Sequence, residues 1–137
     1  QDEAYRDNHQ RYQQARQLVA AQQYSAAQEI LAGLDADTQA SYQVLYLQAR
    51  CAEGNGDYSA AAAYMQKAQE TRPAFLQDQL FLYKYGAILY QVQDYETAGL
   101  YLQASLKYKQ DKETTAQAQE LLDKINREYS GEVGLNE

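Results

Sequence analysis

Tryptophan is missing from this sequence of 137 residues, and cysteine, histidine, methionine and proline each occur only once. The single cysteine, Cys51, cannot form a disulfide within the chain, and cysteine spacings typical of metal sites are lacking. His9 and Cys51 lie far apart, and no set of nucleophile, base and orienting residue surrounds either of them. We therefore expect no catalytic activity, no metal site and no cofactor.

Positive charge is also scarce, because 12 lysines and arginines stand against 19 aspartates and glutamates, for a net charge of -7. General nucleic-acid binding requires a basic surface, so nucleic acid is not an expected partner. A membrane-spanning helix needs about 20 consecutive apolar residues. No apolar run of the sequence approaches this length, so membrane insertion is not expected either.

The beginning of the chain bears on where the protein works. The sequence starts at Gln1, and its only methionine, Met65, is internal. This indicates that the native start was removed, either with a targeting peptide or with further upstream sequence. Together with the acidic, alanine- and glutamine-rich composition, it favours an exported bacterial protein in the periplasm, with the cytoplasm as the alternative.

What the sequence does contain is an internal repeat in a helix-favouring composition. The segments "QQYSAAQEIL", "GDYSAAAAYM" and "QDYETAGLYL" align on Tyr24, Tyr58 and Tyr95, which are 34 and 37 residues apart. Three aligned positions around these tyrosines share their chemistry: small residues nine before (Ala15, Ala49, Gly86), alanine three after (Ala27, Ala61, Ala98) and large apolar residues seven after (Leu31, Met65, Leu102). Apolar residues at helical spacing on both sides of a short turn predict helix hairpins. Asp57 and Asp94 are expected to cap the second helix of their hairpins.

This pattern resembles the tetratricopeptide repeat, whose period is 34 residues. The resemblance implies an all-α fold: a right-handed α-solenoid of three hairpins, at about 8–41, 42–75 and 79–112, within a single domain 1–137. The first repeat departs from the family pattern at Arg11 and Gln14. An amphipathic segment at about 113–129 is expected to cover the last repeat, and glycines predict a loose tail at 130–137.

In the resembled family, the first helix of each hairpin lines a concave groove that binds a peptide or another protein. Carried over by position, the groove residues are Tyr12, Arg16, Val19, Tyr46, Arg50, Tyr83, Lys84 and Tyr90. The same helix faces also carry His9, Gln43, Glu53, Leu80 and Ala87. Tyrosine and arginine are enriched at binding hot spots, which favours this interpretation. The alternative is that the tyrosines pack against neighbouring repeats and the arginines neutralise nearby acids.

The leading functional hypothesis is a non-catalytic adaptor or scaffold that binds a protein or peptide, with an acidic or carboxylate-bearing segment favoured by Arg16, Arg50 and Lys84. Bacterial envelope assembly or secretion would be its setting. One alternative is a secretion chaperone that keeps translocator proteins soluble. Another is a structural protein that self-associates into homo-oligomers through its repeat faces.

Overall fold

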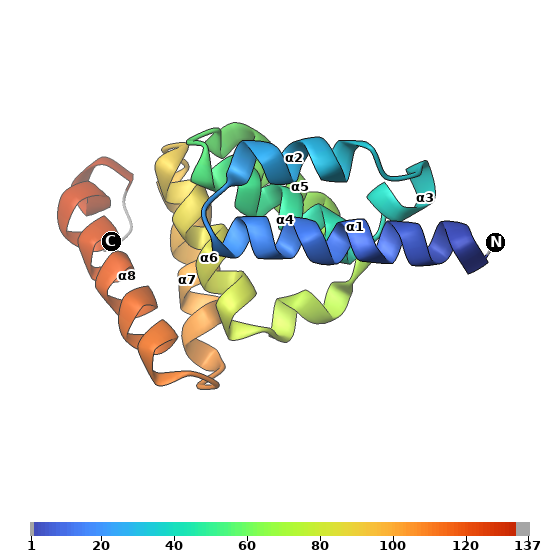
Figure 1. The fold of residues 1–137 in the computed structure, drawn as a ribbon. Coiled ribbons are helices and arrows are strands. Elements are labelled where there is room, and N and C mark those ends of the chain that lie inside the picture. The colour runs from blue at the N-terminus through green and yellow to red at the C-terminus, as the bar shows by residue number, and fades with distance from the viewer. Residues whose placement is uncertain (1, 134–137) are drawn as a thin grey trace. The chain divides into compact units, whose positions relative to one another are not determined.

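The computed structural model describes residues 2–133 of the chain (Figure 1). All regular structure in this range is helical, and no β-strand occurs in it. The all-α prediction is therefore confirmed for the described residues. The chain divides into two compact units: a first unit that ends at Arg72 and a second unit that begins at Pro73.

The first unit consists of two helix hairpins and a short linking helix. Helices α1 (Asp2–Ala20) and α2 (Tyr24–Ala32) form the first hairpin, and α4 (Tyr42–Gly54) and α5 (Tyr58–Thr71) form the second. The short helix α3 (Ala36–Gln39) lies between them in sequence. Helix α4 contacts both α1 and α2, so the two hairpins share one core (Figure 1).

The second unit consists of one hairpin, a leading turn and a long final helix. The 3₁₀ helix η1 (Pro73–Gln77) precedes the hairpin of α6 (Gln79–Gln91) and α7 (Tyr95–Lys107). Phe75 of η1 is buried and stacks on Phe81 of α6, with ring centroids 4.3 Å apart. Helix α8 (Lys112–Val133) packs against α7 and α6 through its buried residues Ala118, Leu122 and Ile125. This packing confirms the predicted amphipathic helix after the last hairpin.

The turns of the three hairpins have the same backbone structure. The residue two positions before each aligned tyrosine has a positive φ: Gln22 (61°), Gly56 (79°) and Gln93 (69°). The N–H of the following residue donates to the carbonyl five residues earlier: Gln23 to Leu18 (2.7 Å), Asp57 to Ala52 (2.8 Å) and Asp94 to Leu89 (3.0 Å). This is the left-handed helix cap with a 6→1 hydrogen bond. Three different local sequences thus build one turn.

The predicted caps of the second helices are confirmed. The carboxylate of Asp57 accepts from the N–H of Ala60, and that of Asp94 accepts from the N–H of Thr97, both at 3.2 Å. The equivalent residue of the first hairpin, Gln23, makes no such bond.

The interior of each hairpin follows the predicted register. All nine aligned small and large apolar residues are buried. In the third hairpin α6 and α7 approach closely at Gly86, where a Cβ atom would lie 2.9 Å from Cγ of Leu102. Side chains of alanine size therefore fit at Ala15 and Ala49, whereas the third hairpin needs glycine.

Two boundaries differ from the predictions. The second helix of the first repeat ends early, because α2 stops at Ala32 and a new helix, α3, is capped by Asp35. At the other end, α8 continues through Gly131 to Val133, so the predicted loose tail is wrong for 130–133, and residues 134–137 lie outside the described residues. One glycine costs a helix only about 1 kcal/mol, which is too little to stop it.

Candidate binding sites in the two units

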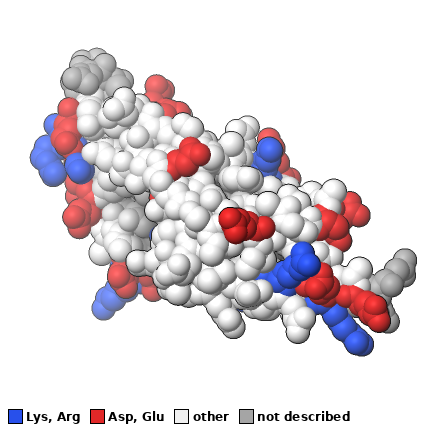
Figure 2. Space-filling view, turned by 45° about the horizontal axis from the view of Figure 1, so that its top comes forward, with Lys and Arg blue, Asp and Glu red and all other residues white. Residues whose placement is uncertain are grey.

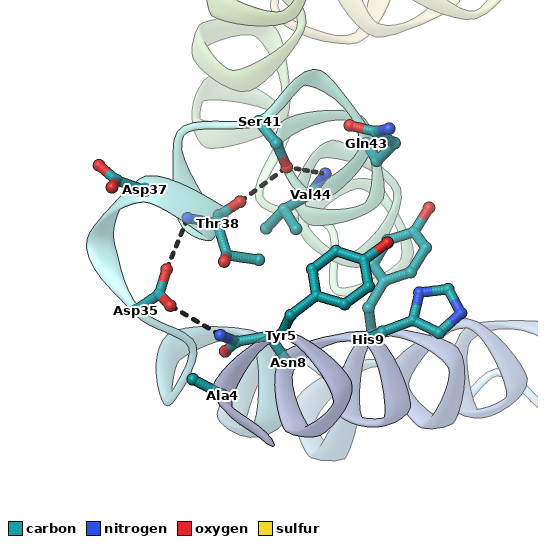
Figure 3. Close-up of a pocket in the computed structure, with 11 residues that line it drawn as sticks. Ala4, Tyr5, Asn8, His9, Asp35, Asp37, Thr38, Ser41, Gln43 and Val44 are labelled. Atoms are coloured by element: carbon teal, nitrogen blue, oxygen red, sulfur yellow. Dashed lines mark hydrogen bonds between the residues drawn. The ribbon is translucent and has the colours of Figure 1, made fainter. Parts of the chain in front are cut away.

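The first unit contains a pocket of about 510 Å³ beside the N-terminal half of α1, which we name the α1–α4 pocket (Figure 3). Its lining comprises Ala4, Tyr5, Asn8, His9 and Tyr12 of α1, then Asp35, Asp37 and Thr38 around α3, then Ser41, Gln43 and Val44 at the start of α4. The five α1 residues are spaced by one, three or four positions, which places them on one face of the helix.

Acidic side chains form the α3 side of this pocket. The carboxylate of Asp35 accepts from the backbone N–H of Thr38 at 2.8 Å and from the side-chain amide of Asn8 at 2.6 Å (Figure 3). Hydrogen bonding from Thr38 holds the pKa of Asp35 below its ordinary value, so this exposed side chain is ionised at neutral pH. The bond to Asn8 also ties α3 to α1.

Aromatic side chains form the α1 side. The ring of Tyr5 is 72% exposed and lies parallel to the imidazole of His9, with centroids 6.1 Å apart (Figure 3). Tyr12 lies further along the same face and is half-buried. Burial raises its pKa, against a smaller opposing effect of the Arg16 charge, so its hydroxyl stays protonated at neutral pH. The pocket therefore combines exposed aromatic surface with carboxylates.

The second unit contains a pocket of about 450 Å³ between α6 and α8, which we name the α6–α8 groove. Tyr83, Ala87, Tyr90 and Gln91 come from α6, and Gln117, Glu120, Leu121 and Lys124 come from α8. The ammonium group of Lys124 lies 5.2 Å from the centroid of the Tyr90 ring, and a hydrogen bond with Tyr90 is the main cause that raises the pKa of Lys124. A cation held over an aromatic ring is thus part of this groove.

A cluster of three tyrosines includes Tyr90, which lines the groove. Tyr129 of α8 stacks on Tyr95 of α7 with centroids 3.7 Å apart, and it meets Tyr90 edge-on at 6.4 Å. These contacts join both helices of the hairpin to α8.

The structure distributes the eight predicted groove residues over several environments. Tyr12 lines the α1–α4 pocket, and Tyr83 and Tyr90 line the α6–α8 groove. Arg16 is exposed and donates to the side chain of Gln13 at 3.3 Å. The remaining surface positions, Tyr46, Arg50 and Lys84, are half-buried and line neither pocket.

Val19 requires a correction. It was expected in the groove, but it is only 6% exposed and belongs to the core of the first unit together with Leu31 and Cys51. An apolar branched side chain that faces α2 and α4 is stabilised by burial there, and it offers no surface to a partner.

Several lining residues were not foreseen. Tyr5 precedes the predicted first repeat, and Asp35, Thr38 and Ser41 lie near the end of that repeat, where no separate short helix was predicted. The signal was present in "GLDADTQAS", where Gly33 and the capping residues Asp35 and Ser41 mark a helix end and two helix starts. On α8, Gln117, Glu120 and Lys124 also line the groove beside Leu121, although no role in binding was predicted for this helix.

Charge is locally mixed on the face that Figure 2 draws. Lysine and arginine side chains lie beside aspartate and glutamate side chains, and most of the described surface between them is uncharged. The preference of each pocket for charge therefore depends on its own lining residues.

The described range contains neither a reactive thiol nor a metal-binding cluster. Cys51 is fully buried, and burial raises the pKa of its thiol to about 11, so it is a packed, protonated side chain. Within residues 2–133, no three histidine, cysteine, aspartate or glutamate side chains gather closely enough to hold a metal ion. Among the described helices, none has the length and apolar character needed to cross a bilayer.

No protein-family model matches the chain, and no curated protein matches it.

Proposed function

We propose that the chain is a non-catalytic helical-repeat module, similar to tetratricopeptide-repeat adaptors, that binds a peptide or protein segment of a partner. In this proposal the three hairpins stack into a right-handed solenoid, with α8 as its cap. One observation carries the binding function: both pockets lie on the helix faces for which the repeat pattern predicts a groove. His9, Tyr12 and Gln43 line one pocket, and Tyr83, Ala87 and Tyr90 line the other.

The chemistry of the two pockets suits peptide side chains. Volumes of about 510 and 450 Å³ lie within the roughly 300–1,000 Å³ typical of ligand pockets. Both linings combine tyrosine rings with a few charged or amide groups, a mixture that gives contact area and fixes orientation. The repeated turns and buried small residues keep the helices that carry these side chains rigid, which lowers the entropic cost of binding.

Tyr46 and Arg50 of α4 are proposed to form the centre of the binding surface. They belong to the middle hairpin of the proposed solenoid, and both side chains are half-buried. With Arg16 and Lys84 they would favour an acidic or carboxylate-bearing part of the bound segment.

The test is a selection of peptides displayed on phage against the whole chain, followed by calorimetric titration of the selected peptides. The variant Tyr46→Ala with Arg50→Ala is expected to weaken binding by at least about 1 kcal/mol per residue. The matched control is Tyr64→Ala with Lys67→Ala, because it removes a tyrosine and one basic residue, three positions apart, from α5. Circular dichroism melting establishes that both variants remain folded.

The proposal fails if selected peptides bind the Tyr46 and Arg50 variant as tightly as the wild type. Loss of binding only in the Tyr64 and Lys67 variant would place the binding surface on α5 instead.

A further inference from the structure

The lining of the α1–α4 pocket indicates which kind of peptide side chain it would bind. This inference rests on the proposed function. We propose that this pocket receives a lysine or arginine side chain of the bound peptide. The ring of Tyr5 would cover the cation from α1, and the carboxylates of Asp35 and Asp37 would meet it from α3. This end of the binding surface therefore prefers the charge opposite to that favoured by Arg16 and Arg50.

The lining residues carry negative charge without a compensating cation. Neither lysine nor arginine is among them. Asp35 is held by the neutral groups of Thr38 and Asn8, which orient the carboxylate but leave its charge uncompensated. Asp37 is exposed and, among the described residues, takes part in no ion pair or side-chain hydrogen bond.

The neighbouring arginine of α1 is already engaged elsewhere. Arg11 pairs with Asp7 at 3.2 Å and donates to the carbonyl of Gly33 at 3.4 Å. Since neither Arg11 nor Asp7 lines the pocket, this pair leaves the charge of Asp35 and Asp37 available to a ligand.

The aromatic and apolar lining suits the rest of a basic side chain. Tyr5 keeps 72% of its surface exposed while its ring is oriented by stacking on His9, so one face remains open to a cation. Ala4 and Val44 supply apolar surface for the alkyl stem of lysine or arginine.

Two other occupants fit less well. An acidic side chain would be repelled by two carboxylates, and a purely apolar side chain would remove water from them without giving them a partner. A bare metal ion would find only two carboxylates and one imidazole, which are not gathered into a metal-binding group in the described chain.

The test uses the whole chain and defined peptides, acetyl-Ala-Ala-X-Ala-Ala-amide, with arginine, lysine, norleucine or glutamate at X. Binding is followed by ¹H–¹⁵N NMR shifts of the Thr38 and Val44 amides. The arginine and lysine peptides are expected to bind about tenfold more tightly than the norleucine peptide, and the preference should shrink as salt increases.

The charge-removing variant is Asp35→Asn with Asp37→Asn, since asparagine keeps the capping hydrogen bond at position 35. It should abolish the preference over norleucine. Asp57→Asn with Asp94→Asn is the matched control, because it removes two negative charges from helix caps outside the pocket. Tyr5→Ala should weaken arginine binding about threefold, whereas Tyr5→Phe should retain it.

Equal binding of arginine and norleucine peptides, an unchanged preference in the Asp35 and Asp37 variant, or no shift at Thr38 and Val44 would each overturn this inference. None of these results would affect peptides selected on phage that depend on Tyr46 and Arg50. The inference and the proposed function can thus fail separately.

Discussion

Gln79 and Gln110 hold each other by reciprocal hydrogen bonds: the backbone N–H of each donates to the side-chain oxygen of the other, at 3.0 and 3.1 Å. Gln79 is 1% exposed, and its side chain also accepts from the N–H of Asp111 and donates to Thr115. These bonds join the start of α6 to the turn before α8. They therefore set where α8 begins to pack and where the α6–α8 groove opens.

Replacement of Gln79 by methionine should destabilise the protein by about 2–3 kcal/mol, because the N–H groups of Gln110 and Asp111 lose their acceptor and the hydroxyl oxygen of Thr115 loses its donor. Methionine has nearly the volume of glutamine, so packing changes little. Urea unfolding measures the effect, and Gln66→Met at an exposed position of α5 is the control. If both variants unfold at the same urea concentration, the hydrogen bonds of Gln79 do not stabilise the native state.

The three equivalent turn residues allow a test in both directions. Gln22→Gly and Gln93→Gly should each stabilise the protein by about 0.5–1 kcal/mol, because glycine adopts a positive φ without the strain of a side chain. Gly56→Gln should destabilise it by a similar amount, although a Cβ atom at Gly56 meets nothing within 4 Å. Thermal melting of the three variants shows whether each is more or less stable than the wild type. A more stable Gly56→Gln variant would contradict the conclusion that the three turns share one backbone structure.

Two helical glycines of the second unit should respond oppositely to substitution. Gly86→Leu is expected to cost about 1–3 kcal/mol, because even its Cβ would crowd Leu102 and force α6 from α7. Gly99→Ala should stabilise by up to about 1 kcal/mol, because its Cβ meets only Leu122, at 3.9 Å, and alanine favours the helix. Chemical denaturation compares the two, and equal effects would show that Gly86 is not a close-approach position.

Stability should also depend on pH through the caps of α3 and α8. Hydrogen bonds from Thr38 and Thr114 lower the pKa of Asp35 and Asp111 below the ordinary value of 3.8. Their contribution is therefore complete above that value and is lost as the pH falls through the lower folded-state pKa. Asp35→Asn with Asp111→Asn keeps acceptors at both caps but removes the titration. The melting temperature of this variant should fall less than that of the wild type between about pH 5 and pH 2. If the melting temperatures of the variant and the wild type fall equally with pH, ionisation of Asp35 and Asp111 does not contribute to stability.

The hairpins could be predicted from the sequence because their determinants are local and recur. The aspartate caps and the residues around Tyr24, Tyr58 and Tyr95 act within a few positions of each turn, so aligned segments reveal them. The positive φ of Gln22 and Gln93 could be inferred only by alignment with Gly56, because glutamine itself does not favour that conformation.

The pockets were harder to predict because they depend on packing between segments distant in sequence. The hydrogen bond between Asn8 and Asp35 joins residues 27 positions apart, and no local sequence pattern predicts it. Helix periodicity places Lys124 off the apolar face of α8, but it does not reveal that Tyr90 of α6 lies opposite. Val19 shows the reverse error, since its position in the repeat pattern was weighed above its apolar side chain.

The 3₁₀ helix η1 occupies the link in which the chain is three residues longer than between the first two hairpins. Because Phe75 folds onto Phe81 within the same unit, this extra length is absorbed without altering either neighbouring turn. The longer link before α6 thus contains a short helix whose Phe75 packs on the hairpin that follows. Cleavage between Arg72 and Pro73 would leave the Phe75–Phe81 contact intact within the second unit.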